Sequence, residues 1–225
     1  MSSLGRYSPN RLRRLISTVG SVRFKDETGE VEYFGQPVVM LSRDAIRLIR
    51  DELVRLGGAA GKVTVHAAGL VSGREEGKAI LAKARSLGIE SPESLPSAIL
   101  TAVEETNMGY GKIRIDDIDL WTLTFKISLS NSFEADQSAT SQTPTCAFML
   151  SYLKGLFSQL IGKDLGGEEV ECKSKGGPCC KFRLSVSSQT KSKVSPSKQS
   201  NRTDSQGLTQ NEMSINEKHN AIFRK

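Results

Sequence analysis

The chain has 225 residues, enough to bury a hydrophobic core without disulfide bonds, although only 37% of them are hydrophobic. Its net charge of +6 comes from its ends: residues 1–25 carry six basic residues and no acid, residues 188–225 have a net charge of +4, and residues 26–187 have −4. No apolar run resembles a signal peptide or could span a bilayer, so we expect a cytoplasmic protein without a membrane span, whose cysteines stay reduced.

The composition divides the chain into three parts. Residues 1–25 are predicted to form a basic N-terminal arm. Residues 188–225 are rich in Ser, Lys, Gln and Asn, and have too little apolar surface to offset the entropy of ordering, so this tail is predicted to be disordered. Either basic end could contact nucleic acid or anionic lipid, but solvated termini are the favoured interpretation. The folded domain is therefore expected within residues 26–187.

Two helical patterns open the domain. Ser42 is a suitable N-cap for an amphipathic helix that should end at Gly57 and Gly58. A second helical pattern from Val63 to about Ala84 places Gly69, Gly73 and Gly77 on one face. Each of these glycines costs a helix about 1 kcal/mol relative to alanine, so the stripe favours a helix or ligand packed very close to it. The alternative is that the glycines belong to a loop.

The second half alternates between strands and one more helix. Residues 112–120 are predicted to pair with a strand from Trp121 to Ser130, in which apolar and polar residues alternate. A helix with Pro144 in its first turn should follow, with Cys146, Met149, Leu150 and Leu153 on its apolar face. Residues 168–186 are then expected to form two strands joined by a Lys-Gly-Gly-Pro turn. The pattern indicates an α+β fold, an antiparallel sheet with helices packed mainly on one side.

Three of the four cysteines lie in the last predicted hairpin. Strand alternation places Cys180 on the face of Phe182 and Leu184, toward the core, and Cys179 on the opposite face. On the incoming strand, Cys172 shares the inward face with Val170. The thiols of Cys146, Cys172 and Cys180 could therefore converge as ligands of a tetrahedral zinc site. The alternative is that they are inert buried cysteines, which behave as small hydrophobic residues.

The fourth ligand is not decided by the spacing. A nearby acid or a water molecule would complete the shell. Glu169 and Glu171 both fall on the outward face, so an inward carboxylate requires a β-bulge or a glutamate that reaches round the edge of the strand.

The stretch "TCAFMLSYLKGLFSQLIGKDLGGEEVECKSKGGPCCKFRLS" resembles the C-terminal half of the 4-vinyl reductase domain family, also called hydrocarbon-binding proteins. The shared features are a Cys that opens a helix, a Glu-x-x-Cys strand, a glycine-containing turn and Cys-x-Phe. They form a core motif over residues 120–187. The family includes the sensor domains of phenol-responsive activators, and its fold is similar to the ligand-binding fold of TRAPP subunits. The resemblance implies a structural zinc held by Cys146, Glu169, Cys172 and Cys180.

The resemblance favours a domain that binds or senses an aromatic or hydrocarbon molecule, and that acts through a regulatory protein partner or as a homodimer. Its pocket is expected between the last two predicted layers, next to the zinc hairpin. The expected ligand-binding residues are His66, Trp121, Leu123, Phe125, Met149, Leu150, Tyr152 and Leu153. The alternatives are a scaffold subunit of a tethering-like complex or a tetrapyrrole vinyl reductase. An enzyme is disfavoured, because the chain has two histidines and no nucleotide-binding loop.

Overall fold

The computed structural model describes most of the chain between residues 22 and 186. The described residues are 22–33, 35–86, 88, 100, 103–104, 109–135 and 141–186. Residues 1–21 of the predicted N-terminal arm and all of the predicted tail lie outside them. No helix in the described part of the chain is long and apolar enough to cross a membrane.

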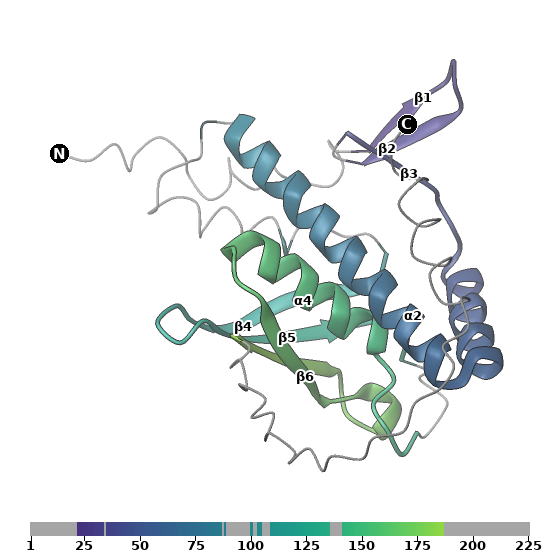
Figure 1. The fold of residues 1–225 in the computed structure, drawn as a ribbon, viewed down its shortest axis with the longest axis vertical. Coiled ribbons are helices and arrows are strands. Elements are labelled where there is room, and N and C mark those ends of the chain that lie inside the picture. The colour runs from purple at the N-terminus through teal and green to yellow at the C-terminus, as the bar shows by residue number, and fades with distance from the viewer. Residues whose placement is uncertain are drawn as a thin grey trace, which may run out of the picture. The chain divides into compact units, whose positions relative to one another are not determined.

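Two antiparallel sheets and two long helices make up the described fold (Figure 1). The three-stranded sheet has the order β1 (Val22–Lys25), β2 (Glu30–Tyr33), β3 (Gln36–Val38). The four-stranded sheet has the order β4 (Lys112–Asp119), β5 (Thr124–Ser130), β7 (Cys180–Val186), β6 (Leu165–Glu171), and the 3₁₀ helix η2 (Lys173–Lys175) connects β6 to β7. Helices α2 (Arg43–Ser86) and α4 (Ala147–Ile161) lie on the same side of this sheet, which confirms the predicted α+β class.

Helix α2 joins the two predicted helices. Ser42 is its N-cap, and its hydroxyl oxygen accepts a hydrogen bond from the amide of Ala45 at 3.2 Å. The predicted end at Gly57 and Gly58 is instead a kink, because Gly58 alone has non-helical angles (φ 53°, ψ −121°) and the helix then continues. We call residues 43–57 the first arm and residues 59–86 the second arm.

The glycine stripe lies in the second arm, so the alternative of a loop is wrong. It allows the backbones of α2 and α4 to touch. A Cβ atom on Gly73 would clash with the carbonyl oxygen of Tyr152 in α4, and one on Gly155 in α4 would clash with the carbonyl oxygen of Leu70. The stripe therefore packs against another helix, one of the two partners that the sequence predicted.

The hydrophobic core lies between α4 and the four-stranded sheet. Strand β5 contributes Phe125, Ile127 and Leu129, each at most 2% exposed, which confirms the predicted apolar face over these positions. Helix α4 covers them with a row of buried side chains. These are Met149, Tyr152, Leu153, Leu156, Phe157 and Leu160.

Trp121 does not belong to this face. Strand β5 begins at Thr124 rather than at Trp121, and the tryptophan side chain is 98% exposed. The alternation fails because the chain turns at this point: a carboxylate oxygen of Asp119 accepts the amides of Trp121 at 2.8 Å and Thr122 at 3.2 Å. Leu123 then adopts a positive φ of 51°, and its side chain is half-buried.

Candidate metal centre

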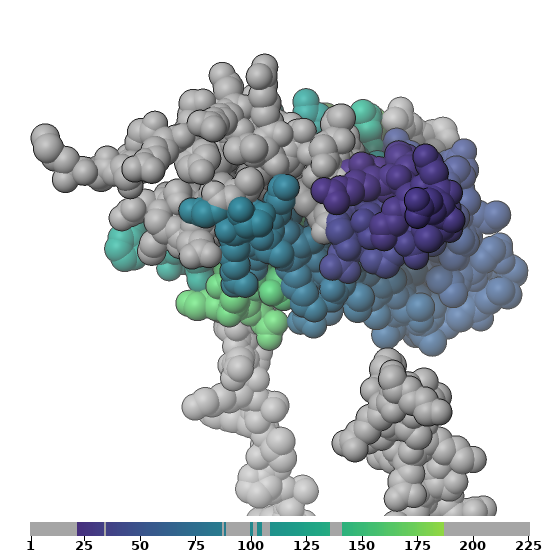
Figure 2. Space-filling view, turned by 90° about the horizontal axis from the view of Figure 1, so that it is seen from above, coloured from purple at the N-terminus to yellow at the C-terminus, as the bar shows by residue number. Residues whose placement is uncertain are grey.

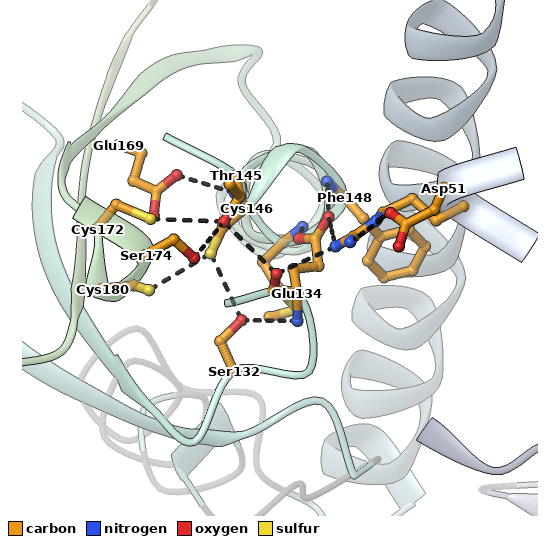
Figure 3. Close-up of polar contacts among 12 residues, drawn as sticks. Asp51, Ser132, Glu134, Thr145, Cys146, Phe148, Glu169, Cys172, Ser174 and Cys180 are labelled. Atoms are coloured by element: carbon orange, nitrogen blue, oxygen red, sulfur yellow. Dashed lines mark hydrogen bonds and ion pairs between the residues drawn. The ribbon is translucent and has the colours of Figure 1, made fainter. Parts of the chain in front are cut away.

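Four metal-binding side chains meet between the start of α4 and the connection from β6 to β7 (Figure 3). One donor atom each from Cys146, Glu169, Cys172 and Cys180 lies within 4.8 Å of every other. Cys146 is the N-cap residue of α4, Cys172 follows β6, and Cys180 begins β7. The three cysteines are at most 2% exposed. The structure thus brings together the set of residues that the sequence resemblance assigned to zinc, in a cluster that could hold a metal ion.

A β-bulge in β6 places Glu169 in this cluster. Glu169 pairs with Phe182 of β7, a residue on the inward face, and Glu171 pairs with the next residue along β7, so Val170 is the extra residue. The expectation that Val170 faces inward with Cys172 is therefore wrong: Val170 is 49% exposed. Because the extra residue resets the alternation, Glu169 and Cys172 both face inward although they are three positions apart.

The start of α4 fixes the position of Cys146. The helix begins at Ala147, so Pro144 precedes it instead of lying in its first turn. The amide of Cys146 donates to Oε2 of Glu169 at 3.0 Å. Its sulfur lies 3.4 Å from the sulfur of Cys180, close to the separation of about 3.8 Å that two thiolates have on a tetrahedral zinc.

Burial and proton sharing shift the pKa values of the thiols in opposite directions. The hydrogen bond with Cys180, together with burial, raises the pKa of Cys146, and the same hydrogen bond lowers the pKa of Cys180. Burial raises the pKa of Cys172. Without a cation, these thiols therefore resist ionising together, and a divalent ion is what would make three adjacent thiolates favourable.

Glu169 supplies an independent test of whether the cluster fits a metal. Its Oε1 atom is buried and has no hydrogen-bond partner among the described residues. A buried carboxylate oxygen without a partner is costly, and a coordinated cation would remove that cost. Three sulfurs and one carboxylate oxygen also form a closed set of four ligands, as structural zinc sites have. The residues present therefore fit a metal ion.

A second buried carboxylate, which the sequence did not single out, lies behind the cluster. Glu134 is 1% exposed, and its two oxygens accept the amides of Phe148 at 3.0 Å and Met149 at 2.8 Å. Burial raises the pKa of Glu134 to about 7, against the opposite effects of these amides and of Arg50. The sequence held one signal for such a group, since a cysteine at the N-cap cannot both bind a metal and cap its helix.

Cys179 lies beside the cluster but is not one of its members. Its side chain is half-buried, whereas the adjacent Cys180 is 1% exposed. The predicted alternation of these two side chains is confirmed by their burial.

The residues predicted to bind a ligand are placed in three different environments. Phe125, Met149, Tyr152 and Leu153 are part of the packed core, and Leu123 and Leu150 are partly buried against it. His66 is exposed, with Nδ1 2.7 Å from the hydroxyl oxygen of Ser151, and Trp121 lies outside the core. Two surface hollows of about 440 and 420 Å³ are lined by other residues.

Tyr152 links the core to α2 through a buried polar contact. Its hydroxyl donates to Oε2 of Glu76 at 2.5 Å, and both side chains are buried. Tyr110 packs edge-on against the ring of Tyr152 at 5.3 Å, and burial together with the charge of Glu76 raises the pKa of Tyr110 to about 12. Phe133 and Phe148 complete a cluster of four aromatic rings next to a carboxylate.

Comparison with protein families identifies the second half of the domain. Residues 125–186 match the family model of the 4-vinyl reductase domain. This match confirms the resemblance that the sequence motifs indicated, over the residues that contain the four-residue cluster. No curated protein sequence matches the chain.

Comparison with solved structures identifies the fold. The phenol-responsive sensory domain of the transcription activator PoxR, solved with phenol, is 23% identical, covers 83% of this chain and 92% of its own, and superposes with a TM-score of 0.65. A vinyl-4-reductase family protein from Methanocaldococcus jannaschii is 17% identical over 83% of this chain and 99% of its own, with a TM-score of 0.37. A trafficking protein particle complex subunit 3 from Naegleria fowleri, covalently bound to palmitic acid, is 10% identical over 64% and 94%, with a TM-score of 0.44.

Proposed function

We propose that the described domain senses a small apolar or aromatic molecule, and that a structural zinc ion fastens its last hairpin to α4. The observation that carries the proposal is the convergence of four buried donor atoms within 4.8 Å, in a region that matches the 4-vinyl reductase domain. Three separate segments of the chain contribute these donors: the start of α4, β6 with the turn after it, and the start of β7.

Zinc suits the donor set better than a hard cation does. Thiolates select soft or borderline ions, whereas Mg²⁺ and Ca²⁺ prefer oxygen ligands. Zinc would neutralise part of the charge of Cys146, Cys172, Cys180 and Glu169 and hold the two strands against the helix. Four protein ligands leave no position for a reactive water, so we assign the ion a structural role.

Elemental analysis and native mass spectrometry of protein purified without added metal test the zinc site. We expect one zinc ion per chain in the wild-type protein and in C179S, whose cysteine lies beside the cluster. C146S, C172S and C180S should each lose most of the zinc. Wild-type protein that is folded but free of metal would contradict the assignment.

The ligand is proposed to bind between α4 and β5, at the residues that the sequence selected there. The support is the family match and a fold shared with a sensory domain. Tyr152 and Glu76 would offer hydrogen bonds beside an apolar surface of Phe125, Met149 and Leu153. Since these side chains are packed against one another, binding requires them to move apart. Trp121 is not included, because its side chain is exposed.

Isothermal titration of the zinc-loaded protein with a panel of phenols, other aromatics and hydrocarbons tests this proposal. We expect at least one member to bind, and Y152F to bind it several-fold more weakly because the hydroxyl is lost. W121A is the matched control and should bind as the wild type does. No binding by any member of the panel would contradict the sensing function and leave the zinc site unaffected.

A homodimer is proposed as the form that transmits the signal to a partner. The first arm of α2 carries apolar side chains that are 39–74% exposed, namely Leu48, Ile49, Leu53 and Leu56. In the space-filling view, much of α2, in blue, is not covered by other described elements (Figure 2). Such a surface is typical of a protein–protein contact.

A further inference from the structure

We infer that Glu134 positions the metal centre: it caps α4 in place of Cys146, and it thereby leaves the Cys146 thiol free to bind the ion. This inference rests on the proposed zinc site and assigns a role to a residue that is not a ligand. Arg50 of α2 is its partner and connects the first arm to the same point.

The need for such a residue follows from the position of Cys146. The side chain of an N-cap residue normally accepts an amide from the second or third residue of the helix, because the first four amides have no partner within the helix. Cys146 is the N-cap of α4, but its side chain makes no capping hydrogen bond. Its sulfur lies instead 3.4 Å from the sulfur of Cys180.

Glu134 accepts both of the amides that a capping side chain would serve. Oε1 takes the amide of Phe148 at 3.0 Å and Oε2 that of Met149 at 2.8 Å, the second and third residues of the helix. Glu169 takes the amide of Cys146 itself at 3.0 Å. Two carboxylates therefore hold the start of α4, one of them a proposed ligand and the other not.

Further contacts tie Glu134 to the ligand on one side and to α2 on the other. The amide of Glu134 donates to the hydroxyl oxygen of Ser132 at 3.3 Å, and this oxygen lies 3.5 Å from the sulfur of Cys146 (Figure 3). Nη1 of Arg50 lies 3.7 Å from Oε1 of Glu134 and donates to its carbonyl oxygen at 3.2 Å. Arg50 offsets the charge of a carboxylate that is buried close to several anionic ligands.

Glu134 is not itself a ligand in this arrangement. The group of donor atoms within 4.8 Å of one another does not include it, and both of its oxygens already accept helix amides. Its removal should therefore leave the ligand count unchanged but move Cys146. Residues that orient metal ligands in this way typically change metal affinity by 10–100-fold when they are replaced.

The test measures zinc affinity at pH 8 by competition with a chromophoric chelator, on full-length protein. We expect E134A and E134Q to bind zinc about 10–100-fold more weakly than the wild type, and R50M to lose several-fold. Glu75→Gln is the matched control, since Glu75 is an exposed residue of α2 that pairs with Lys78 at 2.6 Å, and it should bind zinc as the wild type does.

Cobalt substitution separates positioning from general stability. The thiolate-to-cobalt absorption bands of E134Q should shift or weaken even when circular dichroism shows it fully folded, which loss of stability alone would not produce. Unchanged zinc affinity and an unchanged cobalt spectrum in E134Q and R50M would overturn the inference while the zinc site stands. Absence of zinc from the wild-type protein would instead overturn the proposed site. Should E134A fail to fold, E134Q and R50M decide the question.

Discussion

Gly73 of α2 lies directly against the backbone of Tyr152 in α4, so that a single added carbon would clash with the carbonyl oxygen of Tyr152. Gly69 and Gly77 make similar approaches at the turns before and after. This contact holds α4 against α2, and α4 in turn carries both Cys146 and the hydroxyl group that binds Glu76.

Gly73→Ala should therefore destabilise the domain. The added Cβ forces two helix backbones apart, and overpacking of this kind costs roughly 1–3 kcal/mol or more. Gly57→Ala is the control, because a Cβ at Gly57 meets nothing within 4 Å, and it should be neutral or stabilise by about 0.5 kcal/mol. Urea unfolding of the zinc-loaded proteins measures both. Equal unfolding free energies for the two variants would refute the close helix contact.

The elements with strong periodicity could be predicted from the sequence, and so could the meaning of the glycine stripe. The second arm of α2 follows a helical repeat in which glycines replace larger residues on one face, so close packing was the physical reason for the pattern. Phe125, Ile127 and Leu129 were assigned to the core because strand alternation and burial agree at these positions.

The failures have local causes that periodicity does not encode. Trp121 continues the apolar alternation of β5, but Asp119 turns the chain before it can join the strand. Val170 is apolar, yet it is the extra residue of a bulge and faces outward. Glu134 was missed because its role depends on the amides of α4, which come close to it only in the folded chain.

Removal of zinc should lower the stability of the wild-type protein. The proposed ion joins α4 to β6 and β7, and a ligand that binds only the folded state adds about 2.7 kcal/mol when its free concentration is 100 times the dissociation constant. The melting temperature should therefore fall on addition of a chelator and recover with zinc. C179S should behave in the same way, whereas C172S should melt at one temperature with and without chelator. A chelator that leaves wild-type melting unchanged would argue against the site.

Alkaline pH should weaken the fold through Tyr110. Burial and the charge of Glu76 raise its pKa from 10.0 to about 12, so the folded state keeps the phenolic proton where the unfolded state has lost it. This contribution is complete below pH 10 and is lost as the pH rises to about 12, at up to roughly 1.4 kcal/mol per pH unit. Unfolding free energies of wild type and Y110F, compared at intervals over this range, should converge. Parallel curves would show that the Tyr110 hydroxyl is not held in a buried, neutral state.

The exposed first arm of α2 should govern the oligomeric state. Leu48 and Leu56 are 63% and 74% exposed, and a carboxylate at either position would be desolvated by a partner surface without gaining a counterion. We expect the wild-type chain to have the mass of a dimer in multi-angle light scattering, and L48E/L56E the mass of a monomer with unchanged zinc content. Leu120→Glu provides the control, since Leu120 is 59% exposed in the turn before β5, and it should remain a dimer. A monomeric wild type would exclude the proposed dimer, and a dimeric L48E/L56E would place its contact elsewhere on the chain.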